Sequence, residues 1–315
     1  MADEFDTIAK LFAPLATHAG ARALLDDAAV LGNLVLTTDA IVEGVHFLAD
    51  DPIETVAKKA LRVNLSDIAA KGAKPVGVLV ALMWPLGRDA REIAAFARGL
   101  GEDLRAFDAP LLGGDTTSTP GPLAVSVTVI GEALGRTPAR ADARAGEDVW
   151  VTGTIGDGML GLQHLGGSIA YELPEEDAAY LIDRYRTPTP RLAFAAAIAA
   201  HASASMDVSD GLAQDAAKIA AASKLAVDLD LAAIPLSAPA QAWVAEGGDV
   251  EVLMGGGDDY ELLFTAPPGA RTAIEAAARA TGLQVTRIGR TAAGAGVTAD
   301  GAPIRAGGYR HKLGR

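Results

Sequence analysis

The chain has 315 residues, which is longer than a single hydrophobic core usually grows, so two domains are expected. Its net charge of −13 argues against a broad basic surface for DNA or RNA, because such binding neutralises backbone phosphates. The absence of cysteine excludes disulfides, thiolate metal sites and cysteine nucleophiles.

The chain start and the apolar runs bear on location. The acidic segment 1–5 lacks the positive charge of a signal peptide. The longest apolar runs, near 76–84 and 192–200, are shorter than the roughly 20 residues that span a bilayer. Half of the residues are hydrophobic and only 5% are aromatic, as in a soluble α/β enzyme. We therefore expect a cytoplasmic protein with no membrane or nucleic-acid partner.

The first half alternates helix and strand patterns. Pro52 suits the first turn of a helix, and Gly72 followed by Pro75 supplies a stop signal. The patterns predict helices over 5–18, 52–70 and 89–107 and strands over 34–38, 76–83 and 123–130.

A polar, charged stretch between about Gly135 and Asp148 predicts the domain boundary, with domains over 1–137 and 147–315. The expected class is α/β (α+β) with two domains. The second half is predicted to contain strands over 149–152, 227–231 and 260–265 and helices over 175–185, 191–202 and 211–223.

Seven aspartates in short motifs carry most of the functional signal. Carboxylate oxygens are hard ligands, and a set without histidine or thiol suits magnesium or calcium better than zinc or copper. If folding gathers them, the protein handles metal-bound phosphates. The seven are Asp26, Asp27, Asp39, Asp67, Asp115, Asp207 and Asp210.

The motifs of the first half also have ordinary structural explanations. Asp26 and Asp27 diverge, so only one need face a site, and the pair could simply cap a turn. Thr37-Thr38-Asp39 ends an apolar strand but also resembles the start of a turn. Asn64 and Asp67 share one face of the predicted helix, either at its rim or partly buried.

Glycine-rich motifs add a possible phosphate contact. The glycines of Gly113-Gly114-Asp115 allow a close approach to a phosphate, although a hairpin turn explains them as well. The segment 153–158 is not G-x-G-x-x-G and fits a loop leading into a helix. An ordinary loop would explain the three glycines before Asp258-Asp259, but it would not explain the acids and the tyrosine that follow them.

The segment 207–211 joins an apolar stretch to a helix whose N-cap would be Ser209 or Asp210. A helix N-terminus binds anions through its free N–H groups, and Asp207 and Asp210 could hold the accompanying metal. The P-loop and protein-kinase motifs are absent, so phosphate handling of those types is excluded. Only His46 lies close to the suspected chemistry.

In their order along the chain, these motifs resemble the thiamine-monophosphate kinase family of the aminoimidazole ribonucleotide synthetase-like superfamily. Any one motif is weak, whereas the ordered set is specific and covers most of the chain. The matching segments are 26–29, 37–39, 43–47, 64–70, 113–117, 206–212 and 259–262.

The resemblance implies a homodimer that pairs the N-terminal sheets, with ATP in the groove between the two domains of each subunit. The implied reaction moves the γ-phosphate of ATP directly onto thiamine monophosphate, which gives thiamine diphosphate and ADP. Several magnesium ions would neutralise the two anionic substrates.

The family pattern also implies roles for individual residues. Asp39 and Asp210 would be catalytic. Contacts to ATP are implied for Gly114, Asp115, Arg140 and Ser209, and contacts to the thiamine substrate for His46, Asp258 and Tyr309. The implied magnesium ligands are Asp27, Thr37, Thr38, Asp39, Asp67, Asp115, Asp207 and Asp210.

The chain departs from the family pattern at two positions. Leu25 replaces a glycine, which requires a negative φ there, and Asp258 replaces a longer glutamate. Two alternatives stay open: another ATP-dependent synthetase of the superfamily, or a magnesium and nucleotide binding protein without catalysis.

Overall fold

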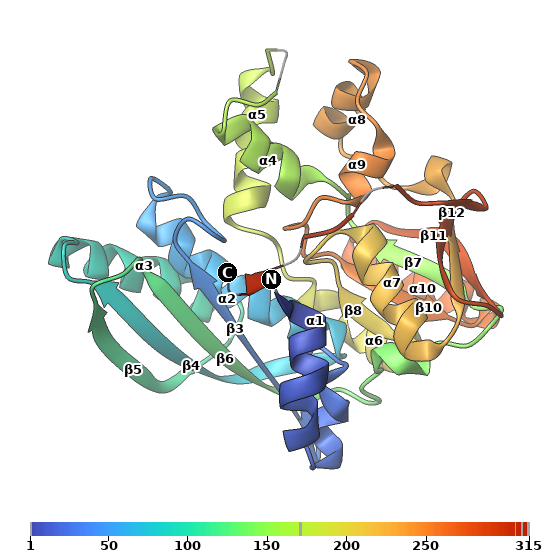
Figure 1. Cartoon of the computed structure of the whole chain (residues 1–315), viewed down its shortest axis with the longest axis horizontal. Helices are drawn as coiled ribbons and strands as arrows, with labels where there is room; N and C mark the ends of the chain where they lie inside the picture. Colours follow the sequence, from blue (N-terminus) through green and yellow to red (C-terminus); the bar gives the residue numbers. More distant parts are fainter. Residues whose placement is uncertain (1, 170–171, 306, 310, 314–315) are drawn as a thin grey trace.

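Two β-sheets, one from each half of the chain, lie at opposite sides of the molecule (Figure 1). The structure is a computed structural model that describes residues 2–169, 172–305, 307–309 and 311–313. The predicted two-domain α/β fold is confirmed. The first sheet ends at residue 133 and the second begins at residue 148. The limits 1–137 and 147–315 stay a prediction.

The first sheet has the strand order β2-β3-β6-β4-β5. Only the β4–β5 pair is parallel, and the other pairs are antiparallel. Two of these strands, β2 and β5, were not expected from the sequence. The strands are β2 (Ala29–Leu31), β3 (Leu34–Val42), β4 (Ala73–Pro85), β5 (Leu111–Thr119) and β6 (Ala124–Ala133).

Two aspartate motifs lie inside strands rather than at strand ends or turns. Residues 37–39 are in the middle of β3, which continues to Val42 and pairs with β6 along its whole length. Residues 113–117 belong to β5, an exposed strand at the edge of the sheet. The alternative of a hairpin turn at 113–117 is therefore wrong, and the contact to a phosphate stays a prediction.

Helix α2 (Ile53–Ala70) lies between the two halves of the molecule (Figure 1). Leu61 and Leu65 pack in the core of the first sheet, whereas Ala69 and Ala70 pack with Phe194 of the second half. Because apolar contacts surround it, most of its residues are buried, including several polar ones. Those polar side chains are consequently held where the two halves meet.

The second sheet has the strand order β13-β12-β9-β11-β7-β10-β8. Its strands are β7 (Asp148–Thr152), β8 (Ser205–Asp207), β9 (Ala226–Leu229), β10 (Leu262–Ala266), β11 (Val285–Ala292), β12 (Gly296–Ala299) and β13 (Ala302–Pro303). Strands β7, β9 and β10 were predicted, while the short β8 and the C-terminal strands were not. In addition, β1 (Ala2–Asp3) pairs with β14 (Lys312–Leu313), which brings the described chain ends together.

Helices pack against both sheets. The predicted loop at 153–158 does lead into a helix, which begins at Asp157. The expected helix over 191–202 is a 3-10 turn, Leu192–Phe194, followed by a shorter α-helix. The remaining α-helices are α3 (Ala90–Ala106), α4 (Asp157–Leu165), α5 (Glu175–Arg186), α6 (Ala195–His201), α7 (Leu212–Ser223), α8 (Ala238–Ala245), α9 (Val250–Met254) and α10 (Arg271–Thr281).

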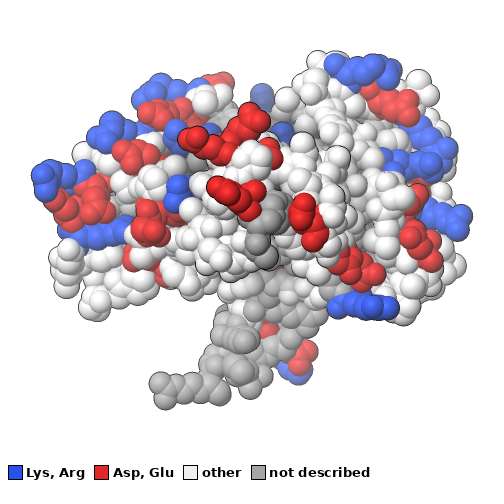
Figure 2. Space-filling model, turned by 90° about the horizontal axis from the view of Figure 1, so that it is seen from above, with Lys and Arg blue, Asp and Glu red and all other residues white. Residues whose placement is uncertain are grey.

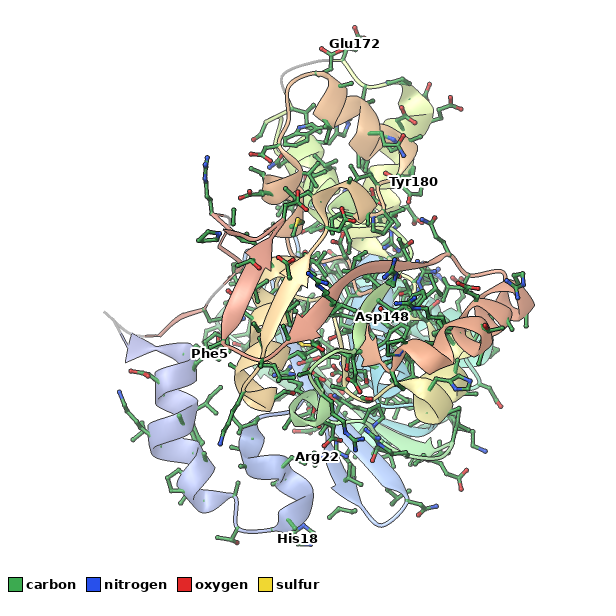
Figure 3. All side chains as sticks on the ribbon, turned by 90° about the vertical axis from the view of Figure 1, so that its right-hand side faces the viewer. Phe5, His18, Arg22, Asp148, Glu172 and Tyr180 are labelled. Atoms are coloured by element: carbon green, nitrogen blue, oxygen red, sulfur yellow. The ribbon has the colours of Figure 1, made fainter. Side chains whose placement is uncertain are left out.

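The N-terminal helix differs from its prediction over 5–18. It begins as α1 (Glu4–Thr7), continues as a π-helix (Ile8–Phe12) and ends as a 3-10 turn (Ala13–Leu15). Figure 3 shows this segment, from Phe5 towards His18, at the edge of the molecule. Regular α-helical bonding ends at Thr7, and Pro14, which has no backbone N–H, lies in the 3-10 turn.

The surface carries charges of both signs. On the face shown in Figure 2, Lys and Arg lie among Asp and Glu towards the two ends, and acidic side chains lie between. That face therefore offers no broad basic area. Among the described residues, no helix is both long enough and apolar enough to cross a membrane.

Gly114 gives a first testable prediction. A Cβ at Gly114 would lie 1.9 Å from the Val80 carbonyl oxygen of β4, whereas a Cβ at Gly113 would meet only a Leu79 methyl at 3.7 Å. Because the first contact is with backbone, we expect Gly114→Ala to lower the free energy of unfolding by about 2 kcal/mol. Urea denaturation measures this change. Gly113→Ala is the matched control, and equal losses in the two variants would contradict the account.

Candidate functional site

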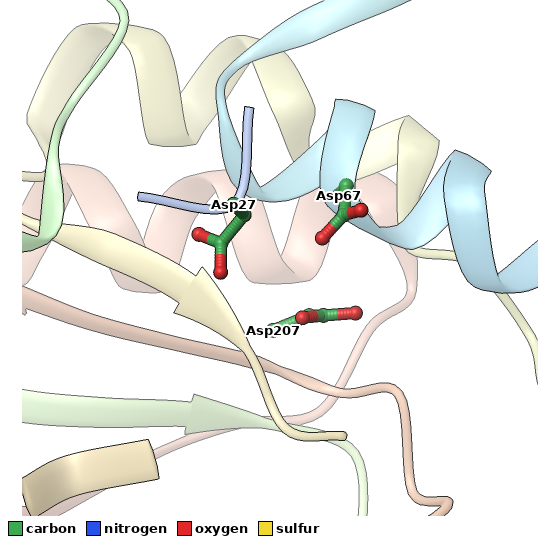
Figure 4. A group of neighbouring side chains, drawn as sticks. All are labelled: Asp27, Asp67 and Asp207. Atoms are coloured by element: carbon green, nitrogen blue, oxygen red, sulfur yellow. The ribbon is translucent and has the colours of Figure 1, made fainter. Parts of the chain in front are cut away.

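Three carboxylates from distant parts of the sequence meet between the two domains. Asp27 precedes β2, Asp67 belongs to α2, and Asp207 ends β8. One ligand oxygen of each lies within 4.8 Å of the others, and Figure 4 shows the side chains facing a common space. Asp67 and Asp207 are buried. Folding therefore gathers three of the predicted metal ligands.

Strand β3 supplies two more of the predicted residues to this cluster. Thr37 Oγ1 donates to Asp67 Oδ2 at 2.5 Å, and the Asp39 backbone N–H donates to Asn64 Oδ1 at 3.0 Å. Asn64 and Asp67 both lie on α2, so residues 37 and 39 face that helix. The sequence left the role of Asn64 open, and in the structure its amide holds β3 against α2.

The Thr38 side chain does not join the cluster. Side chains alternate between the two faces of a strand, so residue 38 points away from the face that carries residues 37 and 39. Its hydroxyl donates to the Val127 carbonyl oxygen of β6 at 3.2 Å. The Thr38 hydroxyl is therefore turned away from the cluster, and the role of Thr38 as a magnesium ligand stays a prediction.

Burial and mutual repulsion change the protonation of the cluster. Burial, with the charges of Asp207 and Asp39 nearby, holds the pKa of Asp67 well above its usual range. Burial, aided by the charge of Asp27, raises the pKa of Asp207 to about 8. Burial also raises the pKa of Asp39. The ionised forms of these three carboxyl groups would therefore be stabilised by a cation bound between them.

Asp27 differs, because basic side chains surround it. Burial alone would raise its pKa, but Arg140 and Lys71 overcome that effect and hold the pKa of Asp27 below its ordinary value. Arg140, which was predicted to contact ATP, forms an ion pair with Asp27 Oδ1 in this structure. Its position beside the cluster still suits a contact to a phosphate.

The donor set fits a magnesium ion. Asp27 Oδ2 is buried and accepts no hydrogen bond, although Lys71 Nζ lies 2.6 Å away. Its contact with Lys71 is an ion pair, so a lone pair of this oxygen stays available to a metal. Carboxylates of Asp27, Asp67 and Asp207 are hard oxygen ligands of the kind that magnesium prefers. The arrangement therefore suits a divalent cation that accompanies phosphate.

The loop after β8 holds Ser209 and Asp210. Neither caps the next helix, because α7 begins after Gly211, and the expected N-cap is therefore wrong. The Asp215 carboxylate instead accepts from the backbone N–H groups of Ser209 at 3.0 Å and Asp210 at 3.1 Å. Lys218 Nζ lies 2.6 Å from Asp210 Oδ2. Asp210 is thus partly buried, ion-paired and close to the edge of the cluster.

The structure does not bring Gly114 and Asp115 to the cluster. Strand β5 is separated from β3 by β4 and β6. With strands about 4.8 Å apart, three steps across the sheet amount to roughly 14 Å. Asp115 therefore lies apart from Asp39 along the sheet of the same chain, and its role as a magnesium ligand stays a prediction.

The predicted substrate residues lie near one another. The rings of His46 and His311 are 5.2 Å apart, and those of His311 and Tyr309 are 5.0 Å apart. Lys59 Nζ donates to the His46 carbonyl oxygen at 2.9 Å and to Asp258 Oδ2 at 3.1 Å. A buried lysine of α2 thus links His46 with Asp258 across the two domains.

Asp258 adopts a left-handed backbone conformation with φ of 71°, which is unusual for a residue other than glycine. The flanking acids hold this conformation. Asp259 accepts from the Gly156 N–H at 2.8 Å, and Glu261 accepts from Arg184 at 2.9 Å. Asp259 and Glu261 are therefore buried and hold the backbone in place, whereas Asp258 faces the site. The sequence did not distinguish these roles.

Comparison with known proteins agrees with this architecture. AIR synthase related proteins match over 25–133 with their N-terminal domain and over 144–301 with their C-terminal domain. A thiamine-monophosphate kinase from Caulobacter vibrioides is 47% identical, covering 94% of this chain and 86% of the relative. The chain belongs to the thiamine-monophosphate kinase family.

Two further members of the thiamine-monophosphate kinase family support this assignment. The enzyme of Salmonella typhimurium is 38% identical over 89% of this chain and 87% of its own length. A solved structure of AaThiL complexed with AMPPCP and TMP has a TM-score of 0.87 and 32% identity, and covers 98% of this chain and 97% of that chain. The resemblance expected from the ordered motifs is confirmed.

The departure at Leu25 is compatible with this family fold. Leu25 has a φ of −104°, so the position does not require glycine. Of the basic residues around the site, the sequence singled out Arg140 but missed Lys59 and Lys71. Lys71 follows Asp67 by four residues, and this spacing on one helix face was the signal that could have found it.

The raised pKa of Asp207 predicts a pH dependence for the metal-free protein. Because the folded pKa is about 8 and the unfolded pKa is ordinary, the unfolded state loses its proton first as pH rises. The free energy of unfolding should therefore fall between about pH 5 and pH 8 in the presence of a chelator. Thermal melts across this range measure it.

Asp207→Asn is the matched control, since its neutral amide does not titrate. We expect the variant to show a flatter pH profile than the wild type in chelator. Identical profiles would contradict the assigned protonation of Asp207.

Proposed function

We propose that the chain transfers the γ-phosphoryl group of ATP to thiamine monophosphate, forming thiamine diphosphate and ADP in thiamine diphosphate biosynthesis. The observation that carries the proposal is the three-carboxylate cluster between the domains of a thiamine-monophosphate kinase family member. The solved relative complexed with AMPPCP and TMP supports the same pair of substrates. The activity is that of a phosphotransferase.

The reaction requires alignment more than acid–base chemistry. The bond between the γ-phosphorus and the β–γ bridging oxygen breaks, and that oxygen leaves with ADP. A bond forms between the γ-phosphorus and an oxygen of the acceptor phosphate. Because this acceptor is already ionised, it needs little help from a base. The enzyme mainly has to bring two anions together.

Magnesium ions, when bound, would neutralise the phosphate charges and stabilise the charge that develops during transfer. Asp27, Asp67 and Asp207 would hold such ions, with Thr37 and Asp39 beside them. Several ions are expected because the cluster extends along β3 and towards Asp210. The chain keeps these carboxylates aligned through α2.

The other roles follow the geometry around the cluster. Arg140 and Ser209 would contact ATP, because Arg140 flanks the carboxylates from the connection between the domains and Ser209 from the loop after β8. His46, Asp258 and Tyr309 would contact the thiamine substrate at the other end of the site. Asp39 and Asp210 would be the catalytic carboxylates, placed between these two regions.

A homodimer would complete the site. Gly114 and Asp115 lie on the exposed edge strand β5, roughly 14 Å from β3 of the same chain by strand spacing. If two subunits pair their N-terminal sheets, the partner's β5 could come close to β3. Asp115 would then complete the partner's ATP site. The cytoplasm remains the expected location.

Two other functions stay possible outcomes of the test. One is another ATP-dependent synthetase of the same fold, and the other is nucleotide binding without turnover. Phosphorus NMR of the protein with ATP, magnesium and thiamine monophosphate distinguishes them. Equal amounts of thiamine diphosphate and ADP support the proposal. Intact ATP would indicate binding only, and ADP with free phosphate would indicate a different acceptor.

Asp210→Asn tests the proposed catalytic carboxylate. We expect a loss of turnover of at least about 100-fold, because the change removes a charged ligand at the phosphates. The unfolding temperature should change little, since Lys218 keeps its ion pair with Asp215 when Asp210 loses its charge. Asp108→Asn, in an exposed turn, is the control. Near-normal turnover of Asp210→Asn at saturating magnesium would refute the role.

Mixed dimers test the contribution of Asp115 from the partner subunit. Asp39→Asn and Asp115→Asn are each expected to be inactive. In a hybrid dimer one site would carry both changes and the other neither, so mixing should restore about a quarter of the activity. Steady-state assays after co-refolding measure this. Inactive mixtures, with hybrid formation verified by mass spectrometry, would contradict the shared site.

A further inference from the structure

Lys71 directly follows α2 and is fully buried. Its ammonium donates to Asp26 Oδ1 at 2.5 Å, to the Ser205 carbonyl oxygen at 2.6 Å and to the Pro138 carbonyl oxygen at 3.4 Å. The same nitrogen lies 2.6 Å from Asp27 Oδ2. All three donors of the ammonium are therefore used, and two carboxylates share its charge.

A buried ammonium is unfavourable unless anions and acceptors surround it. Lys71 meets both conditions at a point where three segments converge. Asp26 and Asp27 belong to the N-terminal half, Pro138 to the connection between the domains, and Ser205 to β8. The lysine thus holds the two halves of the molecule together at the edge of the carboxylate cluster.

The cluster has a basic side and an acidic side. Asp26 pairs with Arg22 and Lys71, and Asp27 pairs with Arg140 and Lys71. On the other side, Asp67 accepts a hydrogen bond from a neutral threonine, and its neighbours include Asp207. Asp27 lies between the two sides and belongs to both.

We propose that Lys71 is an internal counter-cation that occupies the Asp26 and Asp27 side of the cluster, a place that a divalent ion would otherwise take. Divalent ions then bind on the Asp67 and Asp207 side, with Asp27 as the shared ligand. The inference rests on the proposed magnesium site. It concerns ion binding and stability, so it can be tested without turnover.

Two consequences follow from this arrangement. The lysine partly neutralises the cluster in the absence of metal, so the free wild-type protein stays folded and gains only modest stability from magnesium. Without the ammonium, Asp26 Oδ1 and Asp27 Oδ2 lose the cation that they share, which favours a further divalent ion.

Lys71→Met removes the charge while keeping an unbranched side chain of similar length. In chelator, we expect its unfolding temperature to be roughly 5 to 10 °C below that of the wild type. Saturating magnesium should restore most of this loss. Isothermal titration calorimetry with magnesium chloride, without nucleotide, should show one more bound ion per chain than in the wild type.

Lys74→Met is the matched control, because Lys74 is an exposed lysine of β4 paired with Glu132. It should match the wild type in both measurements. Equal ion stoichiometry and equal magnesium stabilisation in Lys71→Met and the wild type would overturn the proposal. If no variant and no wild-type sample binds magnesium, the proposed metal site itself is wrong.

A folding failure of Lys71→Met is also informative. If it folds only with magnesium, the ion replaces the ammonium as proposed. If it fails in both conditions, Lys71→Gln is titrated in the same way with the same expectations. Failure of both neutral variants even at saturating magnesium would show that an ion does not replace the lysine, which would refute the inference.

Discussion

The structure depends on one electrostatic constraint, which is the burial of several carboxylates where the two domains meet. Desolvation and mutual repulsion both oppose ionisation of Asp67 and Asp207, so each needs a proton or a cation to stay stable. Among the described residues, lysine and arginine form ion pairs with Asp27 but not with Asp67 or Asp207. The remaining requirement for positive charge is what suits the site to magnesium and bound phosphates.

Helix α2 makes this arrangement possible. Its apolar residues pack in the cores of both halves, so the helix is fixed on opposite sides. From this helix, Lys59 contacts Asp258, and Asn64 contacts β3. Asp67 joins the carboxylate cluster, and Lys71, just after the helix, contacts β8. One buried helix therefore transmits the position of each domain to the groups that act on the substrates.

The sequence predicted the two-domain fold and most of the cluster, because motif order and hydrophobic periodicity are local properties. It could not predict the face on which Thr38 lies, since this depends on the position of residues 37–39 within a strand. It placed Asp115 in the same site as Asp39, because strand order is not visible in a sequence. Lys71 was missed because its burial requires three distant segments to meet.

The central claim is that Asp27, Asp67 and Asp207 together hold a divalent ion. The most direct measurement is anomalous X-ray diffraction from crystals grown with manganese in place of magnesium and with a non-hydrolysable ATP analogue. The account predicts an anomalous peak within about 2.2 Å of oxygens from all three carboxylates. Manganese bound elsewhere, with no peak among these three side chains, would contradict it.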